Sequence, residues 1–238
     1  MKALIFSILL QWKLNFRSKE ILVHFYVVPL IFYVFIGSIF ISINPQLTET
    51  IVASMTVFGV SMGGILGSPY PLVEFFASDC KKSYHVQNIP LSIQLISHCI
   101  SGFIHLSVLS IILWFTAPLL FDAVLPTNLP VYFSSLALLI LASLGIGMIF
   151  GLFFKSASKM SMATQIVFLP SLMLSGIMFP ADMLPAVLQN VGKFFPASLG
   201  FSAMTSDHFT YEQLLLLLIF VSASLISMIR IRKIHAEE

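Results

Sequence analysis

Few side chains in the apolar parts of this chain could do chemistry, and two histidines stand out among them. His98 and His105 are seven residues apart, so a helix would carry them on one face. Their separation along the helix axis is about 10 Å, too far for both to bind one metal ion. The pair fits a proton relay or a substrate contact, or else two neutral imidazoles that hydrogen-bond to neighbouring helices. Gln165 is a further polar side chain that could line a pathway.

The sequence lacks the motifs that would give this chain catalysis or nucleotide binding of its own. It contains no HExxH, GxSxG or GxxxxGK[ST] motif, and Gly192-Lys193 is followed by Phe194. Cys80 and Cys99 form neither a disulfide framework nor a metal-binding spacing. We therefore expect no enzyme activity, no bound metal and no cofactor. Any powered process would draw its energy from another polypeptide.

The composition places these residues in a membrane. Of 238 residues, 58% are hydrophobic and only 9% are charged. Soluble domains carry about 25% charged residues, so these charges cannot cover a water-facing surface. The high hydrophobicity also excludes a disordered chain. A net charge of +2 is too small to indicate a nucleic-acid partner.

Apolar runs separated by polar or proline-rich breaks predict an all-α integral membrane protein with six transmembrane helices. The predicted spans are 21–43, 51–73, a stretch within 91–120, 131–154, 160–179 and 214–229. The last span has 16 uncharged residues and is therefore short, so either Glu212 and Arg230 snorkel toward the interface or the membrane is thinned locally.

The basic residues predict the orientation of these spans. With the N-terminus in the cytoplasm and six crossings, every Lys and Arg except Lys193 falls on the cytoplasmic side. Membrane insertion strongly favours this arrangement over its inverse. We therefore expect both termini to be cytoplasmic. An odd number of spans would scatter the basic residues over both sides.

The segment 1–19 precedes the first span and reads as an amphipathic helix in the cytoplasmic interface. Apolar and polar side chains each repeat at helical spacing on separate faces of it. The alternative is that it extends the first span. The apolar face carries Ile5, Leu9, Trp12 and Phe16, and the polar face carries Ser7, Gln11, Asn15 and Ser18.

Two connecting segments are long enough to have roles of their own. Segment 74–90 is the longest cytoplasmic loop, and it is either a partner contact or a solvated connector. Segment 180–213 lies outside and is largely apolar. We expect two short helical pieces there, which either dip into the outer leaflet or close over the bundle. Its apolar stripe consists of Leu184, Val187, Leu188 and Val191.

The stretch 169–198 carries a recognisable pattern, LPSLMLSGIMFPADMLPAVLQNVGKFFPAS. A proline inside the fifth span, the Ser-Gly pair that follows it and three later prolines resemble the ABC-2 family of ABC transporter permeases. The loop that ends at Ile89-Pro90 is similar to the family's loop between spans two and three. The resemblance covers residues 1–238, which we therefore treat as a single ABC-2 transmembrane domain.

The resemblance implies that the substrate pathway and ATP hydrolysis belong to different chains. Such permeases pair with a second, identical or paralogous, permease chain and with two cytosolic ATPase subunits, which bind the ATP and Mg. The loop between spans two and three, here about 76–87, would be the coupling helix that contacts the ATPase. Its candidate residues are Ser78, Asp79, Lys81, Lys82, Tyr84 and His85. The outer gate would include Pro170, Ser175, Gly176, Phe179, Pro180, Pro185 and Pro196.

On this reading the chain is a multi-pass protein of a bacterial cell membrane and exports its substrate by alternating access. The 23 Phe and 11 Met favour a hydrophobic or amphipathic cargo, such as a drug, an antimicrobial peptide or a lipid-like molecule. One alternative is a secondary transporter that uses His98 and His105 to couple to an ion gradient. Another is a membrane anchor or sensor subunit that transports nothing.

Overall fold

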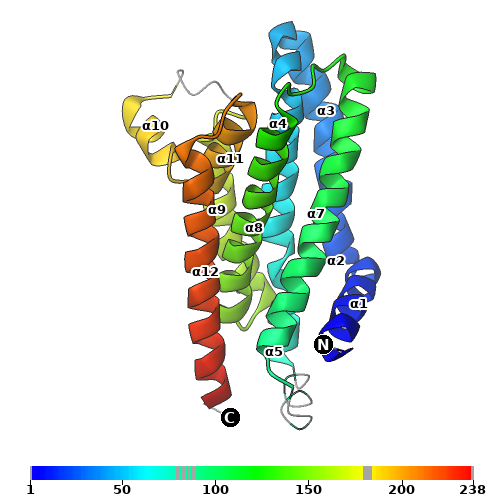
Figure 1. Ribbon diagram of the computed structural model, residues 1–238, viewed down its shortest axis with the longest axis vertical. Coiled ribbons are helices and arrows are strands. Elements are labelled where there is room, and N and C mark those ends of the chain that lie inside the picture. Colours follow the sequence, from blue (N-terminus) through cyan, green and yellow to red (C-terminus); the bar gives the residue numbers. More distant parts are fainter. Residues whose placement is uncertain are drawn as a thin grey trace.

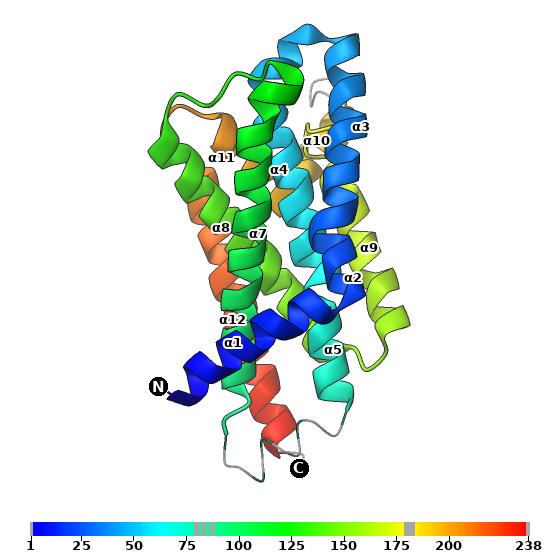
Figure 2. The same cartoon turned by 90° about the vertical axis from the view of Figure 1, so that its right-hand side faces the viewer.

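The chain folds into an elongated bundle of helices. The computed structural model describes residues 2–78, 81, 84, 86, 89–178 and 184–236, and within these ranges it is helical and contains no strand. The N-terminus and the C-terminus lie at the same end of the bundle, the lower end in Figures 1 and 2. The all-α prediction is confirmed.

Within the described residues, five segments are long and apolar enough to cross a membrane. Two of them are interrupted by a π-helical turn. The first comprises α2 (Lys19–Leu22), the π turn η1 (Val23–Val27) and α3 (Val28–Ile43). The short 3-10 helix η2 (Pro45–Glu49) leads to the second, which comprises α4 (Ile51–Ser61), the π turn η3 (Met62–Gly67) and α5 (Pro69–Ala77). The others are α7 (Ser92–Phe121), α8 (Leu129–Phe153) and α12 (Tyr211–Ala236).

The stretch predicted as the fifth span forms a shorter helix. α9 (Ala157–Met173) has 17 residues and so measures about 26 Å, less than the hydrocarbon thickness of about 30 Å. It ends before residue 179 because Gly176 adopts a positive φ of 81° and turns the chain. In Figure 1 the chain descends through α8, returns upward through α9 and descends again through α12. The count of six spans stays a prediction.

The prediction of a short last span was wrong. α12 has 26 residues and includes both charged residues that we expected to lie outside it. Glu212 sits in the first turn, where the helix dipole favours a carboxylate, and its Oε1 accepts a hydrogen bond of 3.3 Å from Ser202. Near the other end, the Arg230 guanidinium lies 5.3 Å from the centre of the Phe153 ring. Each charged side chain thus has one neighbouring contact, while Glu212 Oε2 and Arg230 Nε have no hydrogen-bond partner among the described residues.

The second span forms the centre of the bundle. Every residue of its most apolar stretch is buried, although it is the least apolar of the five candidate spans. Close approach of α8 depends on glycine: a Cβ at Gly147 would collide with the Gly64 carbonyl oxygen and the Ser68 hydroxyl of η3 and its cap. The small residues of these two helices thus serve packing inside the bundle.

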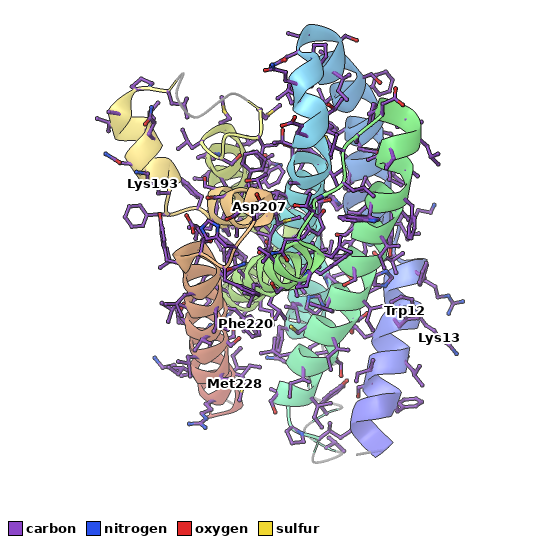
Figure 3. The ribbon with its side chains drawn as sticks, turned by 45° about the horizontal axis from the view of Figure 1, so that its top comes forward. Trp12, Lys13, Lys193, Asp207, Phe220 and Met228 are labelled. Carbon is purple, nitrogen blue, oxygen red and sulfur yellow. The ribbon has the colours of Figure 1, made fainter. Side chains whose placement is uncertain are left out.

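The segments that carry basic residues gather at one end. α1 (Lys2–Arg17), the connection from α8 to α9 and the end of α12 all lie toward the lower end of Figure 1. Lys193 follows α10 (Ala186–Gly192) at the opposite end, and Figure 3 shows it far from Lys13. The asymmetry expected from the sequence is therefore present in the fold, whereas the assignment of the lower end to the cytoplasm stays a prediction.

The outer segment contains the two short helices that were expected. α10 keeps Val187, Leu188 and Val191 exposed, so its apolar stripe does not pack on the bundle. α11 (Pro196–Thr205) buries Leu199, Ala203 and other small or apolar side chains between α8, α4 and α12. One piece therefore closes over the bundle while the other presents an apolar surface outward.

Candidate functional site

The N-terminal helix α1 packs with its polar face inward. It ends at Arg17, and Ser18 caps α2 by accepting a 3.4 Å hydrogen bond from the Ile21 amide. α1 is thus a separate helix that crosses α7 in Figure 2, and it does not continue the first span. Gln11 and Asn15 are 3% and 1% exposed, whereas Leu9 and Leu14 are exposed. The polar stripe of α1 therefore serves contact with the bundle. That α1 lies in the membrane interface stays a prediction.

A chain of hydrogen bonds runs from the loop after α5 to the start of α7, crosses to α1 and returns to α7 at Ser101. The Tyr84 hydroxyl donates to Gln94 Oε1 over 3.1 Å, and Gln94 Nε2 donates to Gln11 Oε1 over 2.9 Å. Gln11 Nε2 then donates to Asn15 Oδ1 over 2.9 Å, and Asn15 Nδ2 donates to Ser101 Oγ over 3.0 Å. Polar groups buried among apolar helices are costly unless they are paired, so this chain holds three segments in one register.

His105 anchors α1 and the first span to α7. Its imidazole stacks on the Trp12 ring with centroids 4.2 Å apart, and its Nδ1 lies 2.7 Å from the Tyr26 hydroxyl. Phe16 and Phe25 complete an aromatic enclosure, and the side chain is fully buried. Within the described part of the chain, Nε2 has no hydrogen-bond partner. The ring is thus fixed on one edge by a neighbouring span.

The other two polar residues that we expected along a pathway lie in different surroundings. His98 is 1% exposed and lies near the Ser68 backbone, but neither ring nitrogen forms a hydrogen bond to a described residue. Gln165 is on α9 and exposed. His98 and His105 do share one face of α7, as their spacing predicted. A role for the three residues in transport stays a prediction.

The candidate coupling residues lie at the end of the second span. Ser78 follows α5, and its hydroxyl donates a 3.1 Å hydrogen bond to the Phe75 carbonyl. Lys81 is half-buried, and Tyr84 packs edge-on against Phe75 with ring centroids 5.0 Å apart. Tyr84 is therefore the candidate that connects this segment to the buried polar chain. Asp79, Lys82 and His85 lie outside the described residues.

The candidate outer-gate residues turn the chain from α9 into the short helices. Ser175 Oγ donates to the Leu172 carbonyl over 2.6 Å and accepts from the Ile177 amide over 3.3 Å. Gly176 makes the turn at positive φ, so its lack of a side chain is required there. The prolines mark helix positions: Pro170 lies inside α9, Pro185 precedes α10 and Pro196 opens α11. Phe179 and Pro180 are outside the described residues.

The described residues provide no cluster of metal-binding side chains. No three His, Cys, Asp or Glu side chains among them are placed to hold a metal ion. What the described part offers is a bundle of apolar helices, with a buried polar network near one end and short helices at the other. This arrangement is that of a helical membrane protein.

The comparisons with known proteins identify the family. A model of the ABC-2 type transporter family matches residues 3–209, and the chain belongs to this family. It is therefore a multi-pass membrane protein and a permease-type component of an ABC transporter. No curated protein matches the chain.

Proposed function

We propose that this chain is the permease subunit of an ATP-driven exporter that moves a hydrophobic or amphipathic substrate out of the cell by alternating access. Two cytosolic ATPase subunits supply ATP and Mg, and a second permease chain completes the pathway. Membership of the ABC-2 type transporter family supports this assignment. The observation that carries it is the hydrogen-bonded chain from Tyr84 to Ser101, because it offers a route from a cytoplasmic loop into a span.

The route works through shared hydrogen bonds. A displacement of Tyr84 acts on Gln94 at the start of α7, and Gln94 acts on Gln11 of α1. Leaving any of these buried groups unpaired costs about 1–3 kcal/mol, so the two helices move together more easily than they separate. The driving energy is the difference in ATP affinity between the open and closed states of the ATPase pair.

The substrate leaves at the opposite end, between the two permease chains and past segment 180–198. Support for this exit comes from α10, whose apolar side chains are exposed. Ser198 ties α11 back to the end of α9 with a 3.3 Å hydrogen bond to the Leu174 carbonyl. Movement of α9 is thereby passed to the short helices.

The test measures ATP hydrolysis by the candidate ATPase, co-purified with the full chain in lipid nanodiscs. Tyr84→Phe removes only the hydroxyl that donates to Gln94. A neutral hydrogen bond is worth about 1 kcal/mol, so we expect about a fivefold loss of substrate-stimulated hydrolysis while co-purification persists. The control is Tyr211→Phe, because Tyr211 is exposed at the far end of α12. Unchanged hydrolysis in Tyr84→Phe, or an ATPase that does not co-purify, would refute the proposal.

A further inference from the structure

A hollow of about 570 Å³ lies beneath α1, between that helix, α5 and α7. It is placed where three candidate spans start or end: Lys19–Ile43 begins, Ile51–Ala77 ends and Ser92–Phe121 begins. These three ends lie in the lower half of the bundle, with α2 beginning above the end of α5 and the start of α7 (Figures 1 and 2). The hollow therefore sits at the depth where the headgroups of one membrane leaflet meet the protein.

The floor of the hollow is rich in hydrogen-bond donors. Gln11, Asn15 and Gln94 line it, and each is more than nine-tenths buried. A side-chain amide has two N–H groups. Each of these three amides donates one of them to a neighbour in the polar chain. Among the residues that the structure describes, the second N–H of each amide has no partner and could bind a guest. Clustered N–H donors favour an oxyanion such as a phosphate.

The rim of the hollow carries one charge of each sign. Arg17 at the end of α1 and Glu74 on α5 both line it and are exposed. Within the described chain, neither side chain forms an ion pair or a side-chain hydrogen bond. A guanidinium pairs well with a phosphate and a carboxylate with an ammonium group. The rim therefore matches a guest that carries both charges.

We propose that this hollow binds one zwitterionic phospholipid with a primary ammonium headgroup, of the phosphatidylethanolamine type. The phosphate would meet Arg17 and the free amide N–H groups, and the ammonium would meet Glu74. The acyl chains would lie along the apolar side of α1, where Leu14 lines the hollow and is 49% exposed. Because the phosphate would bond to groups of the polar chain, the lipid would fasten α1 to α7. This inference concerns the permease chain alone and needs no ATPase.

The experiment is native mass spectrometry of the full chain, released from detergent after titration with defined ligands. Phosphatidylethanolamine is compared with diacylglycerol of the same acyl chains, with phosphatidylglycerol and with inorganic phosphate. We expect one tightly retained phosphatidylethanolamine. Removal of a charge-assisted contact by Arg17→Gln should weaken it about tenfold. Glu74→Gln should weaken it as well and should leave phosphatidylglycerol bound at least as well as before.

Lys13→Gln is the matched control, because Lys13 is an exposed cation on the same helix that does not line the hollow (Figure 3). It should change the affinity by less than about twofold, since phosphatidylethanolamine has no net charge to attract. Arg17→Gln and Lys13→Gln both change exposed side chains. A thermal stability equal to that of the unaltered chain verifies that they fold. Equal weakening by Arg17→Gln and Lys13→Gln would overturn the site. If diacylglycerol bound as tightly, the hollow would recognise acyl chains and no headgroup. If millimolar inorganic phosphate displaced the lipid, the ligand of the hollow would be a soluble anion instead.

Discussion

Replacement of Gln11 by leucine would measure what the inward polar face of α1 contributes to stability. Gln11 is 3% exposed, accepts a hydrogen bond from Gln94 Nε2 and donates one to Asn15 Oδ1. Leucine is of similar size and can do neither. Each abandoned buried partner costs about 1–3 kcal/mol. Both partners line the hollow beneath α1, where water can reach them, so we take the lower end and expect a total loss of about 2 kcal/mol.

The assay is equilibrium unfolding of the full chain in mixed micelles, followed by circular dichroism. Gln165→Leu is the control, because it makes the same chemical change at an exposed position of α9 and should stay within about 0.5 kcal/mol. Each single variant, Gln11→Leu or Gln94→Leu, already breaks the hydrogen bond between these two side chains, so the double variant loses that bond only once. Its effect should therefore fall short of the sum by about 1 kcal/mol. Strict additivity, or equal losses in Gln11→Leu and Gln165→Leu, would refute the reasoning.

The remaining predictions concern packing and topology. Gly147→Ala should destabilise the bundle by about 1–3 kcal/mol in the same assay, because its methyl group would meet the Gly64 carbonyl; unchanged stability would contradict the close contact. Trp12→Ala should cost about 2 kcal/mol through the lost stack on the buried imidazole and Trp12→Phe clearly less, whereas equal losses would argue against stacking. With both native cysteines replaced, an impermeant maleimide should label Lys193→Cys in intact cells and Lys233→Cys only after lysis. Labelling of both from one side would contradict the predicted topology.

The sequence predicts the membrane helices because their signal is local. Apolar runs and proline breaks placed four of the five candidate spans within a few residues of their observed ends. The sequence analysis placed both ends of the last span too far inward, since it took a charged residue as the end of a membrane helix. Glu212 and Arg230 lie inside the helix, where Ser202 contacts the Glu212 carboxylate and the Phe153 ring lies under the Arg230 guanidinium. Contacts of that kind cannot be read from a run of residues.

The polar network under α1 was partly visible in the sequence. Ser7, Gln11 and Asn15 repeat every four residues, and Gln94 is one of the few polar residues at the start of a span. Periodicity shows that the polar side chains share a face, but not whether that face meets water or protein. An interfacial helix ordinarily turns its apolar face toward the lipid and its polar face toward water. Here the polar face meets α7 because Gln94 and Ser101 supply matching partners across the contact.

The central position of the second span bears on how the chain is made. During synthesis each apolar segment leaves the insertion machinery according to its own affinity for lipid. The segment Ile51–Ala77 has the weakest such affinity of the five, yet in the finished bundle it touches no lipid along its most apolar stretch. The helices that bury it include α7 and α8, which follow it in the chain. Substitutions on those later helices that disturb the Gly64–Gly147 contact should then appear as chains inserted with the wrong topology, before any loss of transport is seen.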